Sequence, residues 1–467
     1  MSTDKINIKD HIIEALSDAD LRKAVYKATA STSVSRLNTT EAIPYWEECR
    51  VKTHCIKKDV IENLDKYLEL FEKNAKNNGI NIHWAIDGND AKNILSEIAK
   101  KNNVKTIVKS KSLTTEEIHL NEFLIGNNID TVETDLGEYI VQLNDQVPSH
   151  LVAPALHLSR TDIGKLFKDK LNVPFTDVPE ELLLIARKKL REKFLSAEMS
   201  ITGVNFAFAE NGSFCVVENE ANAHLSLSLP QVHVAVMGIE KLLPSIDELP
   251  YFLKLLAPSA TGQKSSSYVN FIGGPSLQKY NEGPKEVHVI LLDNGRSKIL
   301  ADPKLRETLY CIRCGACLNV CPVYQQIGGH AYDWTYMGPI GITLIPQYLG
   351  EIEGKDAPFL SSLCGACADV CPVKIKLPQH ILELRKNVVQ KNKSKIFEKF
   401  AMKTWIAVST HPKLYRLFSW KIKKLQSFIP VEYLKLPGYH KKRSFPGIDK
   451  KGFREQYYQM KKNNNEQ

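Results

Sequence analysis

Seven of the ten cysteines of the chain fall in two short runs whose spacing suits metal binding. The first run reads Cys311-Ile-Arg-Cys314-Gly-Ala-Cys317-Leu-Asn-Val-Cys321-Pro322. This is the bacterial iron–sulfur spacing, in which three cysteines hold one cluster and the fourth ligates the other cluster. The second run, Cys364-Gly-Ala-Cys367-Ala-Asp-Val-Cys371-Pro372, repeats the pattern with one cysteine missing. Thiolates grouped this tightly are typical of iron–sulfur or zinc sites, and iron–sulfur clusters would carry electrons.

Exchange of the last cysteine between the two runs defines two ligand sets. The first cluster is predicted to be 4Fe–4S and bound by Cys311, Cys314, Cys317 and Cys371. The second receives Cys321, Cys364 and Cys367 and lacks a fourth cysteine. Ser361 stands three residues before Cys364, where that fourth ligand is expected. The second cluster is therefore predicted to be 4Fe–4S completed by Ser361, water or an external ligand, or else 3Fe–4S.

Two other roles of the cysteines, zinc binding and disulfide formation, are less favoured by the sequence. Four cysteines also suit structural zinc, but two similar runs that both end in Cys-Pro and share ligands favour iron and sulfide. A disulfide framework is typical of short secreted chains, whereas this chain is long enough to build its own core. Cys49, Cys55 and Cys215 are scattered, and we interpret them as reduced thiols.

Composition indicates a globular protein of several domains. The chain has 467 residues, of which 43% are hydrophobic and 25% charged. It contains no run of about 18 apolar residues, and its first ten residues lack a hydrophobic signal core. We therefore expect a cytoplasmic protein, which could also contact the inner face of the membrane.

Changes of pattern divide the chain into four parts. Residues 1–78 show apolar residues at helical spacing, and residues 79–300 alternate apolar strands with helices, which predicts a parallel sheet covered on both faces. Residues 301–390 hold the cysteine runs and are predicted to be a mostly helical, ferredoxin-like two-cluster module. Residues 391–467 form a basic helical tail. The strands are expected at 80–86, 104–108, 129–133, 203–208, 214–217, 233–237 and 287–292, and Thr114-x-x-Glu117 is expected to cap a helix.

The positive charge is confined to the tail. The last 77 residues, from Lys391, carry 19 Lys and Arg and five Asp and Glu, a net charge of +14. The preceding 390 residues carry a net charge of −5. Basic residues alternate with aromatic ones such as Trp405 and Trp420, so the tail could lie on an anionic membrane, bind an acidic partner, or simply be solvated. No nucleic-acid-binding module accompanies the charge.

Polar segments of the α/β region are candidates for ligand binding, because open parallel sheets bind ligands at the carboxyl ends of their strands. Lys109-Ser110-Lys111-Ser112 could hold a carboxylate or phosphate. Glu210-Asn211-Gly212-Ser213 is favoured as a hairpin turn over a catalytic site. Asp135 and Glu138 are favoured as an acidic pair at a helix start. The last candidates are the loop Glu218–Asn222 and the histidines His150 and His157, which are more often ordinary structural residues than proton acceptors.

Three segments of the α/β region, followed by the cysteine runs and the basic tail, resemble the lactate utilization protein B family. They are Thr134–Leu143, Pro148–His157 and Thr202–Ser213 leading into Glu218–Asn222. The resemblance covers essentially the whole chain and implies a fold related to the CoA-transferase and sugar-phosphate isomerase group. It also implies conversion of L-lactate to pyruvate with two companion subunits, one cysteine-rich and one sharing the α/β domain.

Two classes of function remain open at this point. The first is a non-flavin iron–sulfur subunit that transfers electrons in a complex oxidising L-lactate. The second is an α/β enzyme acting on a CoA ester or sugar phosphate, with clusters that serve structure or redox sensing.

Overall fold

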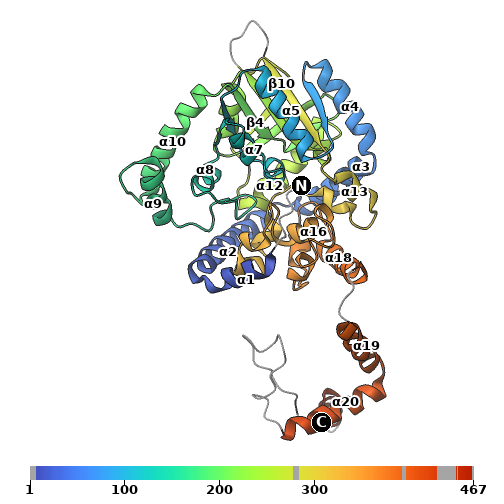
Figure 1. Ribbon diagram of the computed structural model, residues 1–467. Coiled ribbons are helices and arrows are strands. Elements are labelled where there is room, and N and C mark those ends of the chain that lie inside the picture. The colour runs from blue at the N-terminus through green and yellow to red at the C-terminus, as the bar shows by residue number, and fades with distance from the viewer. Residues whose placement is uncertain (1–6, 277–282, 392–395, 429–448, 450, 465–467) are drawn as a thin grey trace. The chain divides into compact units, whose positions relative to one another are not determined.

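Figure 1 shows the computed structural model of the chain, which describes residues 7–276, 283–391, 396–428, 449 and 451–464. The chain forms two compact units, Met1–Lys391 and Asn392–Gln467. The first unit contains the α/β region and both cysteine runs, and the second contains the basic tail.

Four helices precede the first strand, as the apolar spacing predicted for the described part of 1–78. They are α1 (Ile8–Ser17), α2 (Ala19–Glu41), α3 (Trp46–Glu62) and α4 (Leu64–Asn77). The side chains of Asn7 and Asp18 accept hydrogen bonds from backbone N–H groups in the first turns of α1 and α2 and so begin these helices. Apolar residues of the four helices belong to one core with the α/β region and the cysteine module. The helices therefore pack as an integral part of the first unit.

Six parallel strands form the central sheet, in the spatial order β1-β10-β7-β4-β2-β3. They are β1 (Asn81–Ala85), β2 (Thr106–Lys109), β3 (Asp130–Glu133), β4 (Met199–Gly203), β7 (Val232–Gly238) and β10 (Glu286–Leu292). Every residue of β7 is buried, because both faces of such a sheet are covered. This arrangement confirms the predicted parallel α/β domain.

Helices and a second sheet cover the two faces of the central sheet (Figure 1). One face packs on α5 (Gly88–Lys101) and α7 (Leu120–Gly126). On the other face, the β2 and β3 end packs on α8 (Leu136–Leu143) and α10 (Pro179–Ser196), next to α9 (Arg160–Leu171). The remainder of that face shares its core with α4, α12 (Leu249–Thr261) and the second sheet.

The second sheet was not predicted. It has the order β8-β5-β6-β9, and its strands are β5 (Phe206–Phe208), β6 (Ser213–Glu218), β8 (Leu242–Leu243) and β9 (Tyr268–Ile272). The single strand expected at 203–208 was therefore wrong, because β4 ends at Gly203 in one sheet and β5 begins at Phe206 in the other. The 3₁₀ helices η1 (Ile239–Lys241) and η2 (Ile246–Glu248) and helix α11 (Asn222–Ser228) complete this part.

The predicted helix cap at Thr114 was also wrong. Helix α6 (Leu113–Glu117) is a single turn, and its N-cap is Ser112, whose hydroxyl accepts a hydrogen bond from the backbone N–H of Thr115 at 3.4 Å. Thr114 lies inside the helix, and the carboxylate of Glu117 is instead buried in an ion pair with Arg296. The predicted cap thus lies two residues after the true N-cap.

The cysteine module is built from short helices. They are α13 (Arg296–Ala301), η3 (Arg306–Tyr310), α14 (Ala316–Asn319), α15 (Tyr324–Ile327), η4 (His330–Tyr332), α16 (Gly338–Tyr348), η5 (Ala357–Leu360), α17 (Ala366–Asp369) and α18 (Leu377–Lys391). α16 is almost wholly buried, and α2 packs against both α14 and α15. The predicted ferredoxin-like helical region after the α/β domain is confirmed.

The second unit is helical, as expected for the basic tail. Its helices are α19 (Ile396–Thr410), α20 (Pro412–Phe428) and α21 (Phe453–Asn464), of which α19 and α20 pack on each other. Across the described part of the chain, none of the helices combines the length and the apolar character that crossing a bilayer requires.

Candidate iron–sulfur centres and the adjoining strand ends

Four cysteines surround a cavity in the cysteine module. Cys311, Cys314 and Cys317 come from the first run, and Cys371 comes from the end of the second. The remaining wall is mostly apolar and is formed by Leu151, Ile312, Gly315, Ile340, Pro372, Val373, Ile375 and Leu377. These are the four cysteines that the exchange of ligands between runs assigned to one cluster.

Backbone N–H groups around this cavity donate hydrogen bonds to cysteine sulfur atoms. The N–H of Arg313 donates to Cys311 Sγ at 3.4 Å, and the N–H of Ile375 donates to Cys371 Sγ at 3.3 Å. Gly315 has φ +77°, and a Cβ there would lie 3.3 Å from Cε1 of His150. A glycine is therefore needed for both the left-handed turn and the close approach of the loop. Donors to cluster-bound sulfur stabilise its negative charge.

Burial makes these cysteines poor acids as free thiols. It raises the pKa values of Cys314 and Cys317 and raises that of Cys371 to about 12. Binding of a thiolate ligand in this cavity therefore depends on a positive partner that replaces the proton, which iron supplies.

Three positive side chains lie near this cavity, two from the N-terminal helices and one from the first cysteine run. Arg50 of α3 donates two hydrogen bonds to the carbonyl oxygen of Cys371, at 2.9 and 3.1 Å. Arg36 of α2, which is buried, donates to the carbonyl oxygen of Val370 at 3.3 Å. Arg313 is buried over the ring of Tyr336 at 4.3 Å. A cluster with four thiolates is anionic, so these charges and the sulfur donors fit its presence.

The second cysteine group lies between the two runs and reaches the surface. Cys321 and Cys367 are buried, whereas Cys364 is exposed. Burial, followed by the nearby Cys321 and Cys364, raises the pKa of Cys367 to about 12, which places these three sulfurs in one neighbourhood. The Ser361 hydroxyl accepts a hydrogen bond from the N–H of Leu363 at 3.1 Å. Within the described ranges, no three His, Cys, Asp or Glu side chains converge closely enough to bind a single metal ion.

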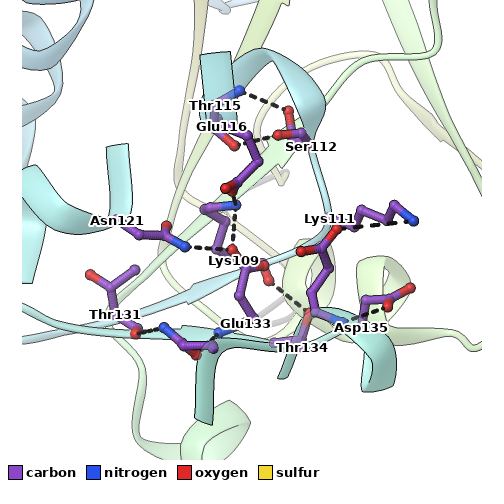
Figure 2. Close-up of polar contacts among 12 residues, drawn as sticks. Lys109, Lys111, Ser112, Thr115, Glu116, Asn121, Thr131, Glu133, Thr134 and Asp135 are labelled. Atoms are coloured by element: carbon purple, nitrogen blue, oxygen red, sulfur yellow. Dashed lines mark hydrogen bonds and ion pairs between the residues drawn. The ribbon is translucent and has the colours of Figure 1, made fainter. Parts of the chain in front are cut away.

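A second group of charged residues lies at the carboxyl ends of β2 and β3 (Figure 2). Lys109 is fully buried and forms ion pairs with Glu133 at 2.5 Å and Glu116 at 3.1 Å. Asn121 donates a hydrogen bond to the same oxygen of Glu133, Oε1, at 2.7 Å. The expectation that this lysine holds an external anion does not fit, because two carboxylates of the chain already occupy its ammonium group.

Lys111 has a different environment. Its Nζ atom is buried but makes no hydrogen bond among the described residues, and its nearest acidic oxygen is Glu138 Oε1 at 4.0 Å. Burial raises the pKa of Glu138 well above its usual value. Asp135, the other member of the predicted acidic pair, is the N-cap of α8 and accepts a hydrogen bond from the backbone N–H of Glu138 at 3.1 Å.

The loop Glu218–Asn222 also reaches these strand ends. Glu220 accepts a hydrogen bond from the backbone N–H of Leu136 at 3.2 Å, and Asn222 is hydrogen-bonded to the Thr134 hydroxyl at 3.2 Å. Glu218 instead accepts hydrogen bonds from two backbone N–H groups in the first turn of α11. Three segments named in the sequence analysis, 109–112, 135–138 and 218–222, thus lie together at the carboxyl ends of β2 and β3.

The other predicted site residues have structural roles. Glu210 lies in the hairpin turn between β5 and β6, as favoured, and its carbonyl is bound by Asn74 of α4. His150 is buried, and both of its ring nitrogens are hydrogen-bonded, one to two backbone N–H groups and the other to Asn319. Burial lowers the pKa values of His150 and His157 to about 4. Neither histidine is therefore placed to take a proton from a substrate.

One buried ionic network was missed from the sequence. Arg296 is fully buried and binds Glu117 at 2.9 Å and Glu240 at 2.6 Å, and Glu117 also accepts a hydrogen bond from Tyr336 at 2.7 Å. The network ties the α/β region to the cysteine module. Its members are up to 219 residues apart, so no local sequence pattern indicates that they interact.

This combination defines a class of protein: a parallel α/β domain joined to a two-cluster iron–sulfur module. Family models agree, because residues 68–292 match the LUD domain and residues 307–375 match the 4Fe-4S dicluster domain. The iron–sulfur clusters predicted from the cysteine runs are thus confirmed as the cofactors of this chain. Residues 381–462 match a third model, the C-terminal part of lactate utilisation protein B.

Curated relatives make the assignment specific. "Lactate utilization protein B" of Bacillus velezensis is 41% identical over 98% of this chain and 98% of its own. The protein of the same name in Bacillus subtilis is 41% identical over 96% of this chain and 95% of its own. The chain belongs to the lactate utilization protein B family. A solved structure of a DUF162 family protein from Deinococcus radiodurans covers 49% of this chain and 98% of its own at 14% identity, but its TM-score of 0.29 is too low to support an argument.

Proposed function

We propose that this chain is the electron-transfer subunit of a complex that oxidises L-lactate to pyruvate. The arrangement of the two cysteine groups in series supports this role most directly. The first group, of which Cys314 and Cys371 are buried, lies beside the α/β domain, and the second ends at the exposed Cys364. The two groups adjoin, because Cys367 of the second lies close enough to Cys317 of the first to influence its ionisation. The names of the relatives supply the substrate.

In this proposal the ligands follow the exchange between runs. Cys311, Cys314, Cys317 and Cys371 bind the first 4Fe–4S cluster, which the shared cavity supports. The second cluster is bound by Cys321, Cys364 and Cys367. Its fourth position is taken by Ser361 or an external ligand, or the cluster is 3Fe–4S.

The chemistry divides between the clusters and the chain. Oxidation of lactate to pyruvate releases two electrons and two protons, and each bound cluster accepts one electron at a time. The apolar wall of the first cavity keeps water away, while the N–H groups of Arg313 and Ile375 and the charges of Arg36 and Arg50 set the local field. These features control how readily an electron enters the first site.

The remaining parts of the chain suit assembly. We propose that residues 1–78 form an N-terminal helical segment and that residues 79–300 form the lactate-utilization domain. Residues 301–390 then form the cluster module, and residues 391–467 form a docking tail. Large apolar side chains of the tail are exposed, including Trp405 at 64% and Trp420 at 58%. This surface, with its excess of Lys and Arg, would bind the two companion subunits or the anionic inner face of the membrane.

The test is anaerobic reduction of the clusters. The loaded chain, mixed with its companion subunits, should lose cluster absorbance and gain an electron paramagnetic resonance signal when L-lactate is added. Cys314→Ser should abolish this response, whereas Cys55→Ser, at an exposed cysteine outside the runs, should leave it unchanged. Clusters that stay oxidised under these conditions would contradict the proposal. Turnover of a CoA ester or sugar phosphate that survives Cys314→Ser would favour the α/β enzyme instead.

A further inference from the structure

Several buried polar atoms at the ends of β2 and β3 make no hydrogen bond within the described chain. They are Ser110 Oγ, Lys111 Nζ, Glu133 Oε2 and Glu138 Oε1. Buried polar atoms in folded proteins nearly always have a partner, so four such atoms in one neighbourhood require an explanation. Glu138 is the most informative, because its side chain is only 4% exposed and Oε1 faces the ammonium group of Lys111.

Two of these residues, Ser110 and Lys111, follow β2, next to the place where the strand order of the sheet reverses. The chain runs from β2 outward to β3, then returns past β2 to β4 and continues through β7 toward the opposite edge. The reversal therefore falls between β2 and β4. Ser112, after β2, lies against Gly203 at the end of β4, where a Cβ would be 2.7 Å from the serine hydroxyl. In open parallel sheets, the carboxyl ends of the strands at such a reversal form the ligand site.

The two lysines of this segment differ in their availability. Lys109 is fully buried and already paired with Glu116 and Glu133. The side chain of Lys111 is 18% exposed although its Nζ atom is buried, and its ammonium group has only one distant carboxylate, at 4.0 Å. Figure 2 shows Lys109 enclosed by its partners, while Lys111 extends away from them above Asp135. Lys111 is therefore the ammonium group that a ligand could engage.

The same lysine lies beside the first cluster cavity. Burial and then the charge of Lys111 lower the pKa of His150, so the ammonium group is within electrostatic reach of that ring. Cε1 of His150 in turn packs on Gly315, which lines the cavity. The hydrogen bond from His150 to Asn319 of α14 holds the contact in place at 3.1 Å. His150 thus contacts the wall of the cavity and lies within electrostatic reach of Lys111.

We propose that Lys111 and Glu138 bind a small 2-hydroxy or 2-oxo monocarboxylate next to the first cluster. The Lys111 ammonium group pairs with the ligand carboxylate, and the Glu138 carboxyl group hydrogen-bonds to the 2-hydroxyl or 2-oxo oxygen. The local charge favours a monoanion, because one available ammonium group stands among Glu133, Glu138 and Glu220. A phosphate dianion would be repelled by these carboxylates. The assignment of a 2-hydroxy acid rests on the proposed function.

Direct binding to the full-length, cluster-loaded chain tests this site. L-lactate and pyruvate are titrated separately by calorimetry, and the electron paramagnetic resonance spectrum of the reduced first cluster is recorded with and without each acid. We expect saturable binding and a changed first-cluster spectrum. Lys111→Met and Glu138→Gln should each weaken binding at least tenfold, and Lys111→Arg should retain part of it.

Lys105→Met is the matched control. It removes the same charge from an exposed lysine near the opposite end of β2 and should bind both acids as the wild type does. Iron and sulfide content and the circular dichroism spectrum show whether each variant folds. If Lys111→Met loses its clusters, the affinities of Lys111→Arg and Glu138→Gln for the two acids, compared with wild type, decide whether the site exists.

Three outcomes would overturn the site: no binding of either acid to the wild type, equal affinities for wild type, Glu138→Gln and Lys111→Arg, or binding of inorganic phosphate in preference to both acids. These outcomes differ from a failure of the proposed function. Binding without cluster reduction in the complete complex would leave the site and refute electron transfer. Cluster reduction by lactate without binding to this chain would refute the site and leave electron transfer.

Discussion

Buried histidines in this chain are held neutral by the groups around them. His233 of β7 lies between the hydroxyls of Ser200 and Thr202 of β4, at 2.9 and 3.2 Å from its two ring nitrogens. Burial, with a smaller effect of His288, lowers the pKa of His233 to about 3. A histidine whose pKa falls on folding stabilises the folded state above its unfolded pKa, near 6.5, and this contribution is lost as the pH falls toward the folded pKa.

The stability of the first unit should therefore fall below pH 6.5, partly because of His233. Between pH 7 and pH 5 the unfolded chain binds a proton at this residue and the folded chain does not, which lowers the free energy of unfolding by about 2 kcal/mol. His233→Gln should be less stable than wild type at pH 7, and the difference should narrow by about that amount at pH 5. Chemical unfolding followed by circular dichroism at both pH values measures it.

His119→Gln is the control, because His119 is exposed (59%). Its difference in stability from wild type should change much less over the same pH range. A His233→Gln difference that stays constant or widens as the pH falls would show that the ring is not kept neutral in the folded protein.

At the scale of elements, the two cysteine runs build the same local structure. Each has a Gly-Ala-Cys segment in which a left-handed glycine, Gly315 at φ +77° or Gly365 at φ +92°, precedes a four-residue helix. The surroundings differ, because a Cβ at Gly315 would crowd His150, whereas one at Gly365 would meet nothing within 4 Å. One run is thus enclosed by the α/β domain, and the other is left open to solvent or a partner.

The proposed exchange of ligands between runs predicts crossed effects of substitution. Cys371→Ser, in the second run, should disturb the spectrum of the first cluster, because Cys371 lines that cavity. Cys321→Ser, in the first run, should disturb the second cluster. Iron and sulfide assays with electron paramagnetic resonance of each variant measure this. If each variant instead lost the cluster nearest to it in sequence, each run would bind its own cluster. Cys215→Ser is the control: it changes a buried cysteine outside the runs and should affect neither cluster.

The sequence predicted elements with a strong local signal. The periodic helices, the central strands and the hairpin at Asn211-Gly212 were found, because each is specified by neighbouring residues. β9 was missed, since only Ile272 of its five residues is buried and the hydrophobic pattern is weak. The spacing of the cysteines along the chain predicted the two sets of cluster ligands. The sequence could not distinguish Lys109, which is neutralised by Glu133, from Lys111, because the relevant carboxylates come from other elements.

At the scale of the whole molecule, the chain forms one compact unit that holds both cysteine groups and a second, basic helical unit. All helices and strands that surround the candidate centres lie in Met1–Lys391, and the tail forms its own unit. Large apolar side chains of α19 and α20 are exposed, among them Phe400, Trp405 and Trp420, which is typical of an interaction surface.

Removal of residues 392–467 should therefore separate cluster binding from docking. We expect the shortened chain to keep the iron and sulfide content of the full chain, because both cysteine groups and their surroundings remain. Its association with the companion subunits or with anionic vesicles should weaken at least tenfold, as measured by co-sedimentation. Loss of clusters on shortening would mean that the tail supports the first unit, and unchanged association would remove its docking role.

The packing of the N-terminal helices also constrains how the protein is made. Arg22 of α2 donates a hydrogen bond to Gln326, 304 residues later, and α2 packs against α14 and α15. At ordinary ribosomal speeds, the helices synthesised first wait roughly 15 to 60 s for these partners to emerge. During that interval the part of α2 that faces α14 and α15 lacks these partners. The packing of α2 is thus completed only after the first cysteine run has been synthesised.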